Sequence, residues 1–349
     1  MEPVSLALVG TGDWGANLLR NFASLPGARV AAICDADPVR LERARKVVPS
    51  AIAVSDARAL LDIPGLEAVV IAAPAAAHAR LAKLFLEAGI DVYVEKPFTL
   101  DVADAEELVA LAERGKRVLM VGHLLKHHPA VKKLKSMIDA GEMGDVRYVY
   151  SQRVNLGKVR SDENALWSFA PHDLSVMLYL LGDEPVDVSA RGQAFLQPGI
   201  EDVVFIYLRW ADGRMAHAHV SWLDPHKIRR FTVVGSKRMA MFDDMEPSEK
   251  VKVYDKGVDT KESAEGSFVD FARAHTVRQG DIWIPKLDGA EPLKLECQHF
   301  VECVRSRATP LTDGRDGLTV VKVLAAAQAS LERQGVPVRL DSLVEGKTS

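Results

Sequence analysis

Two short stretches of this sequence carry side chains that suit acid–base chemistry. Glu95-Lys96-Pro97 follows a β-branched and aromatic run, and because proline cannot continue a sheet ladder, Lys96 is predicted to stand at a strand end. His172 lies between Pro171 and the apolar run Leu174 to Leu181. A neutral histidine in a cleft is a plausible general base at physiological pH, and a lysine at the carboxyl end of a parallel strand faces the crevice in which such a sheet binds ligands. These residues are our candidate catalytic pair.

His172 is predicted to precede the start of a helix at Leu174. The positive end of the helix dipole would disfavour protonation of its imidazole there, which suits a general base. Trp167, a few residues earlier, could stack on a base or a sugar, or lie in the core as such residues commonly do. Both are candidate substrate contacts.

Cations gather in the stretch from Ser151 to Arg160. Arg153 and Asn155 share one face of a predicted strand, and Lys158 and Arg160 follow past a glycine. Arginine suits a bidentate contact with a carboxylate or diphosphate, and lysine a point-charge contact. Asn155 could bind a sugar hydroxyl or amide. We predict an anionic substrate; the alternative for the cations is a solvated strand end.

A phosphate-binding pattern stands near the N-terminus. Gly10-Thr11-Gly12-Asp13-Trp14-Gly15 follows the apolar run Val4 to Val9 and opens an amphipathic helix, as the Gly-x-Gly-x-x-Gly pattern requires. Gly10 allows a tight turn, Gly12 lets the backbone approach a pyrophosphate, and Gly15 lets helix and strand pack closely. The pattern predicts a dinucleotide site, against the alternative of a glycine-rich turn without a ligand.

Asp35 indicates which dinucleotide is bound. It ends the next predicted strand, Arg29 to Cys34, twenty residues beyond Gly15. A carboxylate there accepts hydrogen bonds from a free ribose 2′-hydroxyl and repels a 2′-phosphate. Arg40 and Arg43 lie further on, in a helix that Asp37 is predicted to cap. NAD is therefore favoured over NADP.

Strands and helices alternate through residues 1–122. Such alternation predicts an NAD-binding Rossmann domain with a doubly wound parallel sheet, whose further strands lie at Ala51–Val54, Leu66–Ala72, Val92–Lys96 and Arg117–Val121. Ligands bind at the carboxyl edge of such a sheet. The cofactor contacts predicted at this edge, besides the three glycines and Asp35, are Asp13, Trp14, Ala73, Pro74, His78, Glu95, Lys96 and Pro97.

Residues 123–349 follow another pattern and predict an α+β domain for substrate binding and oligomerisation. Long strands joined by short turns predict an open, largely antiparallel sheet. Two helices are expected at Glu296–Ser306 and Asp316–Arg333. The poorly periodic stretch Asp255 to Glu291 is predicted to be a mobile loop.

The amino-acid composition argues against several classes of binding partner. The net charge of -4 gives no electrostatic basis for binding nucleic acid. Three scattered cysteines suit a reducing compartment and have no metal-ligand spacing, so neither a disulfide framework nor a metal is expected. The most apolar run, Ala68 to Ala77, is too short to span a bilayer, and Met1-Glu2-Pro3 lacks the basic start of a signal peptide. We expect a cytoplasmic protein without a membrane partner.

The glycine pattern, Asp35, Glu95-Lys96-Pro97 and His172 together resemble the Gfo/Idh/MocA oxidoreductase family over essentially the whole chain. More closely, Asn155-Leu-Gly-Lys158-x-Arg160 and Leu166-Trp-Ser-Phe-Ala-Pro-His172-Asp173 resemble the WlbA/WbpB branch. That branch oxidises UDP-N-acetylglucosaminuronic acid at C3″ in the biosynthesis of bacterial surface polysaccharide and lipopolysaccharide sugars. Lys96 and His172 match the family's catalytic residues. Ser168 stands where many relatives carry an aspartate.

The resemblance implies an NAD-dependent dehydrogenase that converts this nucleotide sugar to its 3-keto form. It also implies a homodimer or homotetramer formed through open sheet faces, with 2-oxoglutarate reoxidising NADH in some of the branch. Two alternatives stay open. One is a family dehydrogenase of a free sugar or inositol. The cationic segment from Asn155 to Arg160 disfavours it, because such substrates are neutral. The other is a non-catalytic NAD-sensing regulator, which loss of Lys96 or His172 would have favoured.

Overall fold

A computed structural model describes residues 2–157, 159–161, 163–260 and 275–342. The chain forms two compact units, Met1–His128 with Ala290–Ala325, and Pro129–Gly289 with Ala326–Ser349. The sequence predicted a single boundary at residue 122. The observed units differ because the chain returns to the first unit at Ala290.

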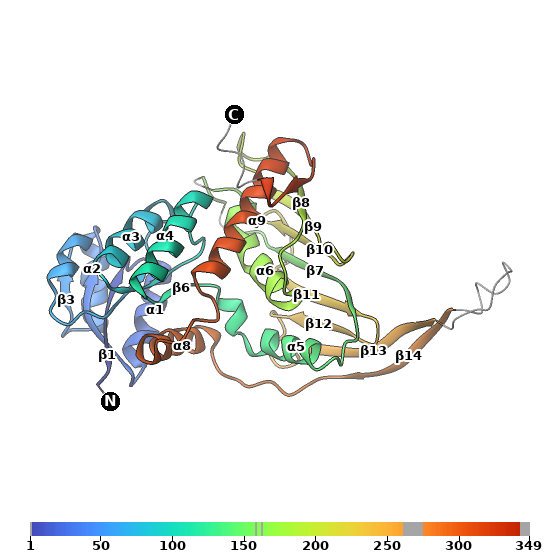
Figure 1. Cartoon of the computed structure of the whole chain (residues 1–349), viewed down its shortest axis with the longest axis horizontal. Coiled ribbons are helices and arrows are strands. Elements are labelled where there is room, and N and C mark those ends of the chain that lie inside the picture. Colours follow the sequence, from blue (N-terminus) through green and yellow to red (C-terminus); the bar gives the residue numbers. More distant parts are fainter. Residues whose placement is uncertain (1, 158, 162, 261–274, 343–349) are drawn as a thin grey trace. The chain divides into compact units, whose positions relative to one another are not determined.

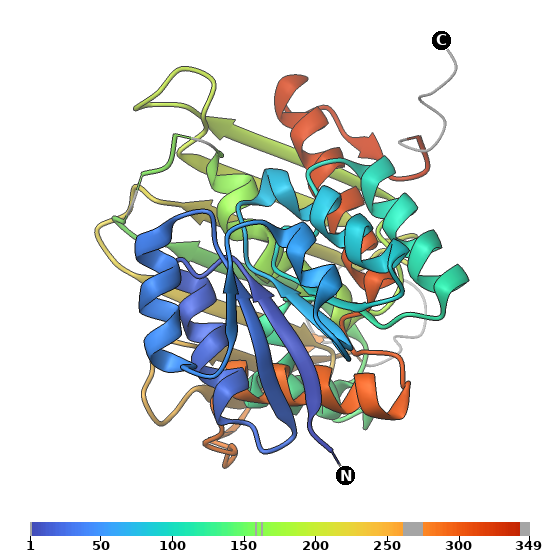
Figure 2. The same ribbon diagram turned by 90° about the vertical axis from the view of Figure 1, so that its left-hand side faces the viewer.

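The first unit holds a sheet of six parallel strands in the order β3-β2-β1-β4-β5-β6. The strands are β1 (Val4–Val9), β2 (Ala28–Cys34), β3 (Ile52–Val54), β4 (Ala68–Ile71), β5 (Asp91–Val94) and β6 (Leu119–Val121). Figure 2 shows this sheet with its helices α1 (Asp13–Ser24), α2 (Pro38–Val47), α3 (His78–Glu87) and α4 (Val102–Gly115). The strand order reverses between β1 and β4, where such sheets bind ligands. The predicted doubly wound sheet is confirmed.

Local signals set several helix ends. Asp37 caps α2 by accepting hydrogen bonds from the Val39 and Arg40 amides at 2.8 and 3.3 Å, as predicted. Asp101 caps α4 through the Ala103 amide at 2.7 Å. Gly115 is the last residue of α4, and the left-handed residue that follows it is Lys116 (φ 52°).

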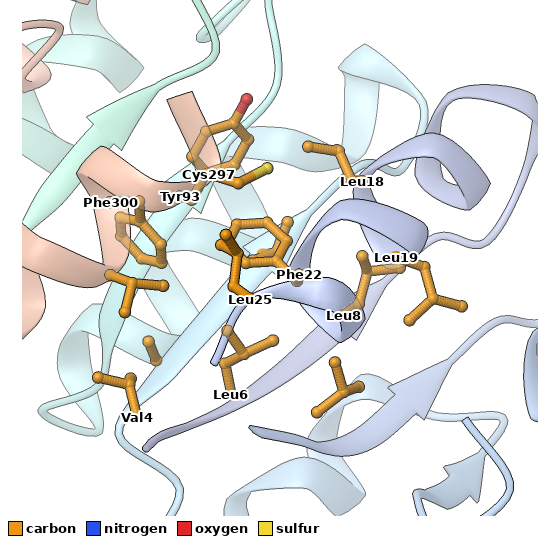
Figure 3. Packing of buried hydrophobic residues seen from close by; sticks show 14 of the residues in the cluster. Val4, Leu6, Leu8, Leu18, Leu19, Phe22, Leu25, Tyr93, Cys297 and Phe300 are labelled. Atoms are coloured by element: carbon orange, nitrogen blue, oxygen red, sulfur yellow. The ribbon is translucent and has the colours of Figure 1, made fainter. Parts of the chain in front are cut away.

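Helix α8 (Pro292–Ser306) belongs to the core of the first unit. Its Phe300 makes edge-to-face contacts with Phe22 of α1 and Tyr93 of β5, with ring centroids 6.2 and 5.7 Å apart, and Cys297 of α8 is buried beside them (Figure 3). Burying these rings stabilises the fold and adds a geometric preference of about 0.5–1.5 kcal/mol for each pair. This packing explains why residues 290–325 join the first unit.

The second unit holds nine strands in the order β14-β13-β12-β11-β7-β10-β9-β8-β15. Neighbours are antiparallel except β7 and β10, which confirms the largely antiparallel sheet. The strands are β7 (Val146–Val154), β8 (Asp187–Gln193), β9 (Val203–Arg209), β10 (Met215–Ser221), β11 (Ile228–Gly235), β12 (Met239–Asp243), β13 (Val251–Thr260), β14 (His275–Trp283) and β15 (Val338–Arg339).

Strands β13 and β14 correct the prediction of a loop from Asp255 to Glu291. They pair with each other and continue the sheet beyond β12 (Figure 1). Alternation was hidden because β13 and β14 carry charged residues and glycine on a two-stranded extension. Residues 261–274, the rest of the predicted loop, lie outside the described residues.

Helices α5 (Pro129–Asp139) and α6 (Ala165–Leu181) also belong to the second unit, and α9 (Gly314–Glu332) begins in the first unit and ends in the second. The helix predicted at Leu174 in fact begins at Ala165, after the cap Asn164, whose side chain accepts from the Trp167 amide at 3.2 Å. Pro171 lies inside it. Burial of most of α6 overrides the local cost of the proline.

Candidate active site

The conformation of the loop at residues 10–15 requires glycine and leaves room for a ligand. Gly10 has φ +89°, and a Cβ there would lie 2.6 Å from the Ala72 carbonyl carbon. A Cβ on Gly15 would lie 1.9 Å from the Gly10 carbonyl oxygen, so only glycine fits at either position. Gly12 caps α1 without a side chain, which leaves the first amides of the helix to an anionic ligand. The loop fits a pyrophosphate.

Asp35 holds this loop from the end of β2. One carboxylate oxygen accepts from the Thr11 amide at 2.7 Å and from its hydroxyl at 2.9 Å, and the other accepts from the Asp37 amide at 2.9 Å. Each oxygen keeps accepting capacity, and the residue is half-buried, so ribose hydroxyls can still bind. The Arg40 guanidinium lies 3.4 Å from the place of a Gly12 Cβ. The sequence had placed Arg40 away from this loop.

Glu95, a predicted cofactor contact, makes hydrogen bonds within the first unit. It is 6% exposed, and its Oε1 accepts hydrogen bonds from the Trp14 indole at 2.6 Å and the Tyr93 hydroxyl at 3.0 Å. Burial raises the pKa of Glu95, while these hydrogen bonds favour its ionised form. Glu95 therefore fastens the start of α1 to the end of β5, and Trp14, 41% exposed, remains available to a ligand.

His78, also a predicted cofactor contact, is buried. Its Nδ1 lies 2.8 Å from the Pro97 carbonyl oxygen and its Nε2 2.8 Å from that of Ala73. Burial lowers the pKa of His78. Through these two contacts the imidazole connects the segment after β4 with the segment after β5 and fixes the backbone beside Lys96. Pro74, in the segment after β4, is exposed. Lys96 is half-buried, two residues beyond the end of β5, and its peptide bond to Pro97 is cis.

His172 lies in the middle of α6 and is half-buried. The prediction that it precedes a helix start is wrong, and with it the dipole argument, because that effect is confined to the first turn. Ser168, four residues earlier, is buried on the same helix face. The serine therefore takes the position from which an aspartate would pair with the histidine.

Two of the three predicted anion-binding cations, Arg153 and Arg160, form ion pairs within the chain. Arg153 is buried, and its guanidinium donates to both carboxylate oxygens of Asp173 on α6. Arg160 pairs with Glu163, with 2.7 Å between its Nε and the carboxylate oxygen. Lys158 lies outside the described residues. Arg153 therefore has an internal carboxylate partner, and anion binding by this segment stays a prediction.

The remaining predicted substrate contacts lie on the α6 side of the second sheet. Trp167 is half-buried, and its indole donates to the Gln328 amide oxygen at 3.3 Å. The Asn155 amide oxygen accepts from Arg229 at 3.4 Å. Arg229 was not among the residues predicted from the sequence. The alternation of buried residues along β11 could have indicated it, because Arg229 shares a sheet face with the buried Phe231 and Val233.

Two properties concern the described part of the chain as a whole. No three histidine, cysteine or acidic side chains gather there as a metal site requires. No helix of that part is long and apolar enough to cross a bilayer.

Comparison with known proteins identifies the family. The family model described as "Oxidoreductase family, NAD-binding Rossmann fold" matches residues 4–123, and the GFO/IDH/MocA C-terminal domain matches residues 131–241. A crystal structure described as that of an oxidoreductase candidate from Magnetospirillum magnetotacticum is 31% identical, with a TM-score of 0.79 over 93% of this chain and 100% of that one. The chain belongs to the Gfo/Idh/MocA oxidoreductase family, and its first unit is an NAD-binding Rossmann domain.

Two relatives of assigned activity match nearly end to end. The scyllo-inositol 2-dehydrogenase (NAD(+)) of Bacillus subtilis is 28% identical over 97% of this chain and 96% of its own length. The UDP-N-acetylglucosamine 3-dehydrogenase of Acidithiobacillus ferrooxidans is 28% identical over 93% of this chain and 98% of its own. The two names share oxidation of a ring hydroxyl and differ in substrate.

Proposed function

We propose that this protein is an NAD-dependent dehydrogenase of a ring hydroxyl in a nucleotide sugar. We propose UDP-N-acetylglucosaminuronic acid as the substrate, oxidised at C3″ to the 3-keto sugar. The observation that carries the dehydrogenase proposal is the setting of Lys96. Both sequence neighbours of Lys96 are held by hydrogen bonds. Glu95 accepts one from Trp14 of the loop at residues 10–15, and the Pro97 carbonyl oxygen contacts His78.

The chain's residues divide the chemistry as follows. NAD, when bound, accepts the hydride from the carbinol carbon. His172 accepts the hydroxyl proton, and Lys96 donates a hydrogen bond to the same oxygen and stabilises its developing negative charge. Neither role requires a metal. Ser168 cannot hold His172 by charge as an aspartate would, so the basicity of His172 depends on its other surroundings.

The choice of a nucleotide uronate has two supports. One relative is named for the C3 oxidation of UDP-N-acetylglucosamine, which differs from the uronate only in having a C6″ hydroxymethyl group in place of the carboxylate. The segment from Asn155 to Arg160 matches the uronate branch in residue type. A second candidate is inositol oxidation, which the Bacillus subtilis relative favours.

NADH formation tests this proposal. The purified protein is offered UDP-N-acetylglucosaminuronate, UDP-N-acetylglucosamine or scyllo-inositol, each with NAD or NADP and with or without 2-oxoglutarate. We expect the uronate to exceed UDP-N-acetylglucosamine in kcat/KM by about ten- to a hundredfold, the worth of one charge-assisted contact. Preference for inositol would support the second candidate. NAD binding without turnover of any substrate would instead indicate a regulator.

A further inference from the structure

A half-buried arginine of the second unit stands beside a second arginine. Arg229 of β11 lies directly opposite Arg153 of β7 in the antiparallel ladder. Cross-strand partners point to the same face of a sheet, so the two side chains share the face on which α6 packs (Figure 1). Like charges in this arrangement repel.

The carboxylates that act on Arg229 already bind other cations. Asp173 accepts from Arg153 through both of its oxygens. Asp244 forms an ion pair with Lys250 at 3.1 Å. Within the described part of the chain, Arg229 forms no ion pair, and its 3.4 Å hydrogen bond to Asn155 is a long one.

Among the described residues, the positive charges of this group exceed its negative charges by one. Arg153, Arg229 and Lys250 lie beside only two carboxylates, Asp173 and Asp244. Burial, and next the charge of Arg153, lower the pKa of Arg229, although an arginine remains protonated at neutral pH. A partly desolvated cation without a counter-ion is unfavourable, and binding an anion relieves it.

The position of Arg229 relates it to the proposed base. Its guanidinium carbon lies 5.8 Å from the ring centroid of Phe169 on α6. Phe169 and His172 are three residues apart on this helix and so are neighbours on its surface. Phe169 and His172 are separated by about 4.5 Å along the helix axis, so Arg229 contacts α6 within one helical turn of the proposed base.

We propose that Arg229 determines specificity by binding an anionic group of the substrate. A guanidinium fork fits the paired oxygens of a carboxylate or a phosphate. In a nucleotide uronate these oxygens belong to the C6″ carboxylate or to the diphosphate. This inference rests on the nucleotide-sugar function proposed above and assigns its anion recognition to a residue outside the segment from Arg153 to Arg160.

Steady-state kinetics of Arg229→Gln with two nucleotide sugars tests the assignment. If Arg229 binds the carboxylate, kcat/KM should fall about ten- to a hundredfold for UDP-N-acetylglucosaminuronate and less than about twofold for UDP-N-acetylglucosamine. If Arg229 binds the diphosphate, both values should fall equally. Arg229→Lys keeps the charge without the fork and should recover part of the loss. Lys227→Gln, at an exposed residue two positions earlier, is the matched control.

A second variant distinguishes loss of anion binding from a failure of Arg229→Gln to fold. Asn155→Asp would supply Arg229 with an internal carboxylate, and so should lower activity on the uronate while the thermal midpoint holds or rises. NAD affinity, a property of the first unit, should stay unchanged in every variant. Unchanged kcat/KM for both nucleotide sugars in Arg229→Gln and in Asn155→Asp would overturn this inference alone. A wild-type protein that oxidises neither nucleotide sugar would overturn the proposed function itself.

Discussion

Lys96 and His172 act on the same hydroxyl group in the proposed reaction, so their removal should have comparable kinetic effects. Lys96→Ala or His172→Ala should lower kcat by about 10²–10⁴-fold, because each removes an interaction that matters in the transition state. NAD affinity, followed by titration of protein fluorescence, should change little. Near-full activity of His172→Ala would mean that another group accepts the proton.

Ser168 offers a sharper test of how His172 is kept basic. Ser168→Asp would restore the acid that many relatives carry one turn before this histidine. If a neighbouring carboxylate stabilises the imidazolium, the acidic limb of the kcat/KM profile should move to higher pH. Ser168→Asn, similar in size but uncharged, is the control and should leave the limb in place. An identical profile for both variants would exclude an electrostatic effect at this position.

At the scale of elements, the segment after β6 buries a histidine whose two ring nitrogens have no hydrogen-bond partner among the described residues. His123 is 1% exposed. Burial, followed by the charges of Lys126 and Lys96, lowers its pKa to about 3. The unfolded chain, with an ordinary pKa of about 6.5, binds the proton more readily between these values. The free energy of unfolding should therefore fall as the pH decreases from about 6.5 toward 3.

His123→Leu should remove this part of the pH dependence. One proton contributes about 1.4 kcal/mol for each pH unit, so the wild type should lose roughly 2 kcal/mol more than the variant between pH 6.5 and 5. Urea unfolding at several pH values measures the difference. His226→Leu is the control, because that residue is exposed. Parallel pH profiles for wild type and His123→Leu would contradict the expectation.

At the scale of the whole molecule, the face of the second sheet opposite α6 carries exposed aromatic side chains. Phe205 and Tyr207 of β9 are 41% and 48% exposed. Phe205 stacks on His219 of β10 with ring centroids 4.4 Å apart, and Tyr207 packs against His217 at 5.8 Å. An apolar sheet face of this kind is typical of an interface between subunits. It supports the proposal of a homodimer or homotetramer.

The double variant Phe205→Glu/Tyr207→Glu should shift the protein toward the monomer. Charges placed on both faces of a symmetric interface repel, and each would be desolvated on association. Light scattering after size-exclusion chromatography measures the mass. Val39→Glu, at an exposed position of α2, should leave it unchanged. A monomeric wild type, or an assembly that tolerates both glutamates, would exclude this face as the interface.

The sequence by itself determined the features that depend on near neighbours. The glycine turn before α1, the caps at Asp37 and Asp101 and the parallel sheet of the first unit follow from local sterics, local hydrogen bonds and hydrophobic periodicity. These signals lie within a few residues of the structure they specify. They were sufficient to predict an NAD-binding Rossmann fold and to bring Lys96 to its ligand-binding edge.

Only the tertiary structure decided what each polar side chain contacts. Glu95 binds Trp14, 81 residues earlier, and Arg153 binds Asp173 across an element boundary. His172 became a mid-helix residue because burial of α6 outweighed the local preference of Pro171. A buried charge or imidazole takes its partner from whatever the fold brings close, and that choice has no period or spacing in the sequence. For the same reason, only the register of β11 against β7 showed that Arg229 lies opposite Arg153.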